Sequence, residues 1–102
     1  MTTDKEYWEN MIKRDKEYIK SYSHGVKERS KKIRQLNLIL AKMKSEPELY
    51  ADEIAVATNM LNKFTKDVEN FKWYVNSGKK DLKEHKKYLQ ELKWQKKIGR
   101  KK

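Results

Sequence analysis

Residues 71–82, FKWYVNSGKKDL, decide the fold of this 102-residue chain. Within them, Asn76-Ser77-Gly78 is typical of a helix end, because glycine readily takes the left-handed conformation that closes a last helical turn. Apolar residues nevertheless recur at helical spacing on both sides of this tripeptide. A helix that ends at Gly78 gives a three-helix fold, whereas a helix that continues through it gives two long helices.

The first half of the chain carries a heptad repeat, which predicts one long helix over about residues 4–44. Asp4 can cap its start. Gly25 is the one weak point, and because the repeat keeps its phase across it, we expect the helix to continue there. The two core-facing series are Ile12, Ile19, Val26, Ile33 and Leu40, and Trp8, Asp15, Tyr22, Arg29, Leu36 and Met43.

A second helix is predicted to begin at residue 46, because Ser45-Glu46-Pro47-Glu48 has the form of a capping box. In this interpretation the Ser45 hydroxyl accepts a hydrogen bond from the Glu48 amide. Pro47 lies in the first helical turn, where the amide hydrogen that proline lacks is not needed. Beyond Gly78 an apolar stripe continues with Leu82, Leu89 and Leu92. The series before it are Ile54, Leu61, Val68 and Val75, and Tyr50, Ala57, Phe64 and Phe71.

We predict a single all-α domain, a three-helix up-down-up bundle with coiled-coil-like packing. Its helices span about residues 4–44, 46–76 and 79–98, followed by a basic tail at 99–102. A turn at Ser45 would let the first helix cover the second only to about residue 82, and the roughly sixteen residues beyond would be marginal as a lone helix. The apolar stripe of the first helix, widened by Met11, Tyr18 and Ile39, also favours two neighbours. The alternative is a long antiparallel helical hairpin, completed by a dimer partner.

Charge is distributed unevenly along the chain, which has 26 basic and 15 acidic residues and a net charge of +11. Residues 1–44 carry +6, residues 45–78 carry −3, and residues 79–102 carry +8. In the bundle two basic clusters would share one end of the molecule, an arrangement that repels itself unless it meets a polyanion. The clusters are Lys27, Arg29, Lys31, Lys32 and Arg34, and Lys93, Lys96, Lys97, Arg100, Lys101 and Lys102.

These clusters predict a non-enzymatic accessory protein that binds DNA or RNA phosphates largely without sequence specificity. Lysines outnumber arginines by 22 to 4, and lysine is a point charge, whereas arginine supplies the fork that reads bases. The alternative is a helical interaction, scaffold or inhibitor protein that self-assembles or docks on an acidic protein surface. A solvated lysine-rich face could also serve solubility alone, although residues 93–102 hold no acid. A membrane surface is disfavoured, because the last helix lacks a strongly apolar face.

The aromatic residues fall into two groups. Trp73 and Trp94 are 21 residues apart and would both face outward on an unbroken helix, where they could stack on nucleic-acid bases. A turn at Gly78 would reset this phase and bring one or both of them into the core. Four other aromatic side chains occupy core-facing heptad positions, and for these we expect packing: Trp8, Tyr22, Phe64 and Phe71.

We expect no catalytic activity, no cofactor and no metal site. His24 and His85 are far apart in the sequence, and no set of histidines and acids has the spacing of metal ligands on one helix face. Asp81 precedes His85 by one turn, which is the ordinary spacing of a surface pair. Asp15 and Arg29 occupy core-facing positions, where polar residues commonly fix register or partner choice.

The composition predicts a soluble protein of the cytoplasm. The chain contains no cysteine, as is common in reducing compartments. Residues 1–10 are polar and acidic, unlike a secretory signal. No apolar run exceeds four residues, the length of the run at residues 38–41, which is far shorter than a membrane span.

Overall fold

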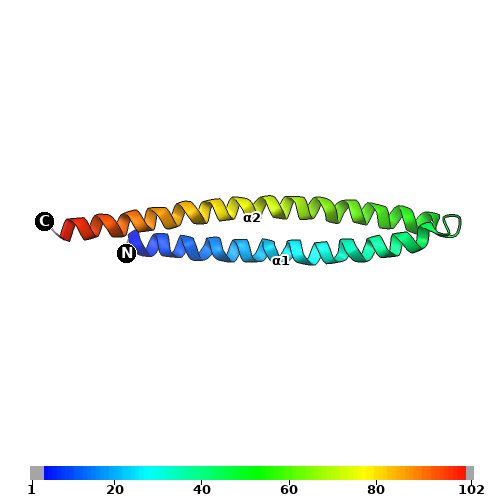
Figure 1. Cartoon of the computed structure of the whole chain (residues 1–102), viewed down its shortest axis with the longest axis horizontal. Helices are drawn as coiled ribbons and strands as arrows, with labels where there is room; N and C mark the ends of the chain where they lie inside the picture. Colours follow the sequence, from blue (N-terminus) through cyan, green and yellow to red (C-terminus); the bar gives the residue numbers. More distant parts are fainter. Residues whose placement is uncertain (1–3, 101–102) are drawn as a thin grey trace. The chain divides into compact units, whose positions relative to one another are not determined.

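The chain folds into two long α-helices joined by a short turn (Figure 1). The computed structural model describes the backbone of residues 4–100 and the side chains of residues 4–95. Helix α1 spans Asp4–Lys44 and helix α2 spans Ala51–Arg100. Among the described residues there is no β-strand, so the all-α prediction is confirmed. The three-helix bundle is wrong, and a helical hairpin fits the structure better.

Both helices run through two compact units. The turn unit comprises Tyr22–Trp73, and the terminal unit comprises Met1–Ser21 with Tyr74–Lys102. Within each unit the helices pack antiparallel. In the terminal unit Trp8 contacts Tyr88, while Tyr18 contacts Tyr74. The turn unit repeats this order, because Tyr22 contacts Phe71 and the Arg29 guanidinium lies over Phe64.

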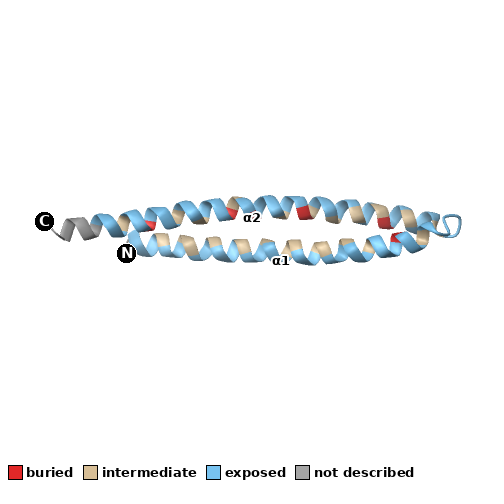
Figure 2. Ribbon diagram, viewed as in Figure 1, coloured by how far each residue is buried: buried red, intermediate tan, exposed pale blue. Residues whose placement is uncertain are grey.

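The core of each unit is the heptad seam between α1 and α2. Every core-facing position predicted for α1 is buried or partly buried (Figure 2). The buried hydrophobic side chains are Leu40, Ala57 and Val68 in the turn unit and Val75 and Leu89 in the terminal unit. None of the described side chains is completely buried, because two helices cover each other on one side only.

Gly78 does not end a helix, so the predicted break at residues 76–78 is wrong. The α2 helix continues through it, and no glycine with described conformation has a positive φ. Gly78 is instead a point of close approach to α1. A Cβ atom placed on it would lie 2.9 Å from both Ile19 Cγ1 and Tyr18 Cδ1. Gly25, where the helix was predicted to continue and does, has the same role, because a Cβ atom there would lie 3.0 Å from the Phe71 ring.

The connection between the helices differs from the predicted capping box. The end of α1 at Lys44 is as predicted, but the Ser45 hydroxyl donates to the Lys42 carbonyl oxygen at 2.6 Å and so closes α1. Residues 45–50 form the turn, and α2 begins at Ala51 rather than at residue 46. Its first backbone bond runs from the Ile54 amide to the Tyr50 carbonyl oxygen, at 2.8 Å. The predicted one-residue connection was too short, because antiparallel helices have axes about 8–10 Å apart.

The longer turn also corrects the predicted coverage of the second helix. In the terminal unit Trp8 packs against Tyr88, with ring centroids 5.2 Å apart. Helix α1 begins four residues before Trp8. Because both helices rise by the same distance per residue, α1 covers α2 to about four residues beyond Tyr88, that is, to about residue 92 rather than residue 82. Leu89 is accordingly buried. Most of the residues that had required a third helix or a dimer partner are therefore covered by α1.

Substitution of Gly78 by alanine tests its packing role. Alanine favours a helix by about 1 kcal/mol over glycine, but overpacking against Ile19 and Tyr18 costs about 1–3 kcal/mol. We expect Gly78→Ala to lower the free energy of unfolding by about 1 kcal/mol, measured by urea titration. The control is Asn76→Ala on an exposed helical position, which should be neutral or stabilising. A stabilising effect of Gly78→Ala would contradict close packing at this residue.

A polar pair crosses the seam of the terminal unit. Oδ2 of Asp15 lies 2.5 Å from Nδ1 of His85, and both side chains are largely buried. The Trp8 ring packs against the His85 ring, with centroids 5.4 Å apart. His85 therefore pairs across the helices with Asp15, and the polar residue in the seam has a matched partner on α2.

Removal of one member of this pair should destabilise the fold. We expect Asp15→Ala to lower the free energy of unfolding by about 1–3 kcal/mol, because it leaves a largely buried imidazole without its partner. The double variant Asp15→Leu/His85→Leu should recover most of this loss, since apolar side chains can replace a buried polar pair. Thermal unfolding of the three proteins measures both effects. Glu9→Ala, which breaks only the exposed 4.0 Å pair with Lys5, should change stability by less than about 0.5 kcal/mol.

Candidate nucleic-acid interface

The strongest basic surface in the terminal unit lies on α2. Five exposed lysines, here called the lysine face, occupy nine consecutive residues of this helix, which rise about 12 Å. Four of them, with Glu84 and Gln90, line a shallow hollow of about 540 Å³. The lysine face comprises Lys79, Lys80, Lys83, Lys86 and Lys87.

Charges of opposite sign are separated around this part of α2. At about 100° per residue, the lysine face, together with Lys93 and Trp94, falls within an arc of about 140°. The acidic residues Asp81, Glu84 and Glu91 fall on the neighbouring arc, and the seam residues occupy the remainder. The helix therefore presents a stripe of positive charge, with Glu84 at its edge beside Lys80 and Lys87.

The lysine face was missed as a cluster by sequence reasoning, which placed the C-terminal cluster at residues 93–102. Of those predicted contacts, Lys93 is exposed and adjoins the lysine face. The signal that could have located it is the net charge of +8 over residues 79–102, which includes these five lysines. All five lysines lie within the helix predicted over about residues 79–98, so helical spacing alone places them on one face. The other predicted contacts lie outside the residues whose side chains are described: Lys96, Lys97, Arg100, Lys101 and Lys102.

The other predicted cluster belongs to the turn unit, and only part of it is available to a partner. Lys27, Lys31 and Arg34 are exposed and follow each other at four and three residues, so they lie on one outward face of α1. Of the remaining members, Arg29 is partly buried between the helices, whereas Lys32 is exposed. The prediction that this cluster and the C-terminal cluster form one surface depended on the three-helix bundle. Because the bundle is wrong, that prediction loses its basis.

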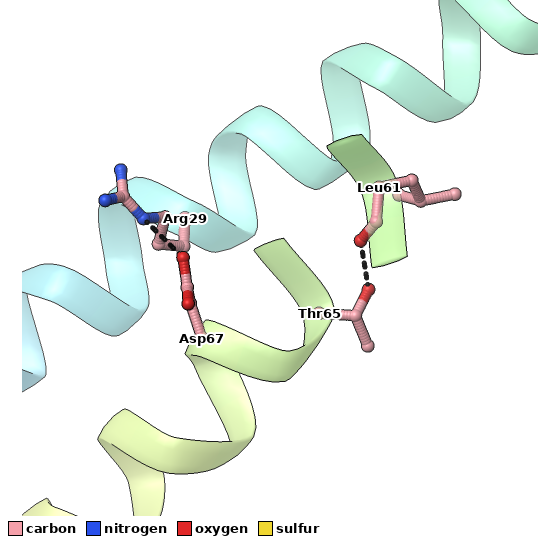
Figure 3. Close-up of polar contacts among 4 residues, drawn as sticks. All are labelled: Arg29, Leu61, Thr65 and Asp67. Atoms are coloured by element: carbon pink, nitrogen blue, oxygen red, sulfur yellow. Dashed lines mark hydrogen bonds and ion pairs between the residues drawn. The ribbon is translucent and has the colours of Figure 1, made fainter. Parts of the chain in front are cut away.

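Arg29 is partly buried against α2. Its Nε lies 3.5 Å from Oδ2 of Asp67, an ion pair longer than a hydrogen bond, and Figure 3 shows the terminal nitrogens pointing away from Asp67. The guanidinium carbon also lies 5.4 Å from the centre of the Phe64 ring, and Lys32 Nζ lies 5.6 Å from the same centre. Two residues before Asp67, the Thr65 hydroxyl donates to the Leu61 carbonyl oxygen at 2.8 Å (Figure 3).

Trp73 and Trp94 are both exposed, at 65% and 64% of their surfaces. They belong to different units, Trp73 to the turn unit and Trp94 to the terminal unit. Only Trp94 adjoins the lysine face, since it follows Lys87 by seven residues on the same helix face. The four aromatic residues predicted to pack, Trp8, Tyr22, Phe64 and Phe71, are partly buried and contact the opposite helix.

Among the described residues, no three or more histidine, cysteine or acidic side chains come together as a metal-binding group. His24 is exposed, and His85 is paired with Asp15. In the same part of the chain, neither helix contains a stretch apolar and long enough to traverse a lipid bilayer. The arrangement supplies positive charge, one exposed indole beside it, and an exposed aliphatic surface in the turn unit.

Comparisons with protein-family models, with curated proteins and with solved structures found no match for this chain.

The different environments of Arg29 and Lys31 can be separated by mutation. We expect Arg29→Ala to lower the free energy of unfolding by about 1–2 kcal/mol, because it removes the ion pair with Asp67 and the contact with Phe64. Lys31→Ala removes the same charge from an exposed position and should change stability by less than about 0.5 kcal/mol. Equal effects in chemical denaturation would show that Arg29 is not part of the packing between the helices.

Proposed function

We propose that this protein is a non-enzymatic, basic helical accessory protein that binds nucleic-acid phosphates through the lysine face of α2. The observation that carries the proposal is the separation of charge around this helix, with five exposed lysines, Lys93 and Trp94 on one arc. A surface kept for solubility alone mixes both signs. A stripe of one sign repels itself and is stabilised by a polyanion.

Lysine dominates this surface, and its chemistry favours phosphate over base contacts. An ammonium group is a point charge without the planar fork that recognises guanine. Phosphate contacts position a protein on nucleic acid but carry no sequence information. We therefore propose binding largely without sequence preference, with affinity that falls steeply as salt concentration rises.

Trp94 favours a single-stranded ligand. An indole exposed beside lysines can stack on an unpaired base, and such stacking contributes about 1–3 kcal/mol per base. The paired bases of a duplex offer no free face. Whether the strand is DNA or RNA is decided by contacts to the 2′-hydroxyl. Stacking of a base on Trp73, which the sequence also predicted, would be separate from binding at the lysine face, because Trp73 lies in the turn unit.

Two further parts of the proposal concern location and the second candidate function. The absence of cysteine is in keeping with a cytoplasmic protein.

An acidic protein surface could bind the same lysines, and the exposed aliphatic residues of the turn unit favour a role in protein interaction. A membrane surface is disfavoured, because the exposed arc of the lysine face is charged rather than apolar.

The salt dependence of binding tests the nucleic-acid proposal. We expect the protein to bind a labelled oligonucleotide at low salt, followed by fluorescence anisotropy. The variant Lys80→Gln/Lys83→Gln/Lys87→Gln should reduce the slope of log K against log salt by about 2–3 for duplex DNA, at about 0.9 per lost phosphate contact. Trp94→Ala should weaken binding of a single strand more than binding of a duplex.

The matched control is Lys13→Gln/Lys16→Gln/Lys20→Gln, which removes the same charge from exposed positions of α1 in the same unit. It should change the slope by less than about one. Equal losses in the two triple variants would show that the lysine face is not the contact surface. A wild-type protein that leaves oligonucleotides free at low salt would overturn the proposed function.

A further inference from the structure

The two units expose different kinds of apolar side chain. Among the residues with described side chains, the exposed large hydrophobic residues of the terminal unit are aromatic, whereas those of the turn unit are aliphatic apart from Trp73. Among these, Ile39 on α1 is 50% exposed, and Val56 and Met60 on α2 are 60% and 44% exposed. Val56, Met60 and Ala57 also line a shallow hollow of about 370 Å³ with Asp52 and Glu53. Aliphatic side chains gathered beside a hollow are typical of a protein interface.

Ile39, Val56 and Met60 lie on the same side of the helix pair. Ile39 directly precedes the buried Leu40, and Met60 directly precedes the partly buried Leu61. With Leu40 and Leu61 at equivalent core positions, Ile39 and Met60 both take the g position of the heptad. In an antiparallel pair the two g positions flank the same side of the seam. Val56 is one turn before Met60 on the same edge of α2.

Charges of opposite sign flank this aliphatic surface. Residues 31–44 of α1 contain five basic residues and no acid, and residues 45–62 contain four acids and no basic residue. Lys42 follows Ile39 by three residues on α1, and Glu53 precedes Val56 by three on α2, so each charge lies on the same edge as its aliphatic neighbour. The α1 edge of this side is therefore basic, and the α2 edge is acidic.

Such a side is complementary to itself. A two-fold axis parallel to the helices places α1 of one molecule on α2 of another, at the same distance from the turn. Ile39 then faces Val56 and Met60 of the partner subunit, and Lys42 faces Glu53 of the partner subunit. An unrelated partner would have to supply both an acidic and a basic edge at this spacing, which a second copy provides by symmetry.

We propose that the turn units of two copies of this chain pack face to face through Ile39, Val56 and Met60, as a four-helix arrangement. The two helices of one unit form a single layer in which no described side chain is completely buried, and a second layer completes such a core. This inference goes beyond the proposed function, because it uses the turn unit rather than the lysine face.

The mass of the protein in solution tests the dimer. Light scattering and sedimentation of the full chain should give twice the 12.4 kDa mass of one chain at micromolar concentrations. On dilution the measured mass should decrease toward that of one chain. Val56→Ser/Met60→Ser should be monomeric where the wild type is dimeric, with an unchanged far-ultraviolet circular dichroism spectrum. Leu38→Ser, at an exposed position one residue away from Ile39, is the control and should remain a dimer. A wild-type monomer at about 100 μM, where a specific dimer of micromolar Kd is populated, would overturn the proposal.

A charge exchange tests the arrangement independently of the aliphatic contacts. Glu53→Lys and Lys42→Glu should each raise the dimer Kd by about fivefold, as expected for an ion pair near the rim. The double variant Glu53→Lys/Lys42→Glu should restore wild-type dimerisation, since each helix then meets the partner's exchanged charge. A double variant that dimerises no better than the single ones would overturn the pairing of α1 with the partner's α2.

The lysine-face variants separate this inference from the proposed function. Lys80→Gln/Lys83→Gln/Lys87→Gln should keep the mass of the dimer, because these lysines belong to the terminal unit. The Val56→Ser/Met60→Ser monomer should retain the lysine face and so bind an oligonucleotide with a similar salt slope per chain. Loss of dimerisation in the lysine variant would contradict the assignment of the interface to the turn unit.

Discussion

The close approach of α1 and α2 at Gly78 is the constraint on which the structure of the terminal unit depends. Glycine normally weakens a helix, because it gains no side-chain contact and loses more backbone freedom than other residues. Here the missing Cβ gives room to Ile19 and Tyr18 of the opposite helix. The local loss in helix propensity is therefore offset by packing across the seam. The continuity of α2 through this point also places Leu82, His85 and Leu89 in register with α1.

A polar pair joins the two helices in each unit. In the terminal unit the pair is Asp15 with His85, and in the turn unit it is Arg29 with Asp67. Apolar heptad positions are interchangeable along a seam, so by themselves they permit the helices to slide by one repeat. A polar residue that must meet its partner removes that freedom, because a displaced register would leave both groups partly buried and unpaired. These pairs explain why charged residues occur at positions otherwise reserved for packing.

The described surface divides by unit into two kinds. The terminal unit offers lysines and an indole on α2, which are suited to phosphates and bases. The turn unit offers aliphatic side chains between a basic and an acidic edge, which are suited to a second copy of itself. The two proposed activities can therefore be removed separately. A protein that dimerises at one unit and binds nucleic acid at the other would present two binding surfaces per molecule, which raises its effective affinity for a long strand.

The sequence by itself determined the helical class, the end of α1 at Lys44, the continuity through Gly25 and the core-facing positions of both helices, because these follow from local periodicity. Only the tertiary structure decided whether the helix ends at Gly78. In the sequence, a glycine that ends a helix cannot be distinguished from one that makes room for a neighbouring helix. The same holds for Ser45, whose hydroxyl can cap either adjoining helix, and for Arg29, whose charge is used by Asp67. The lysine face lies within the helix predicted over about residues 79–98, so helical spacing in the sequence was sufficient to find it. At Gly78 and Arg29 the deciding contacts join residues that are far apart in the chain. The Ser45 hydroxyl instead bonds to Lys42, three residues away, and closes α1, because α2 begins only at Ala51.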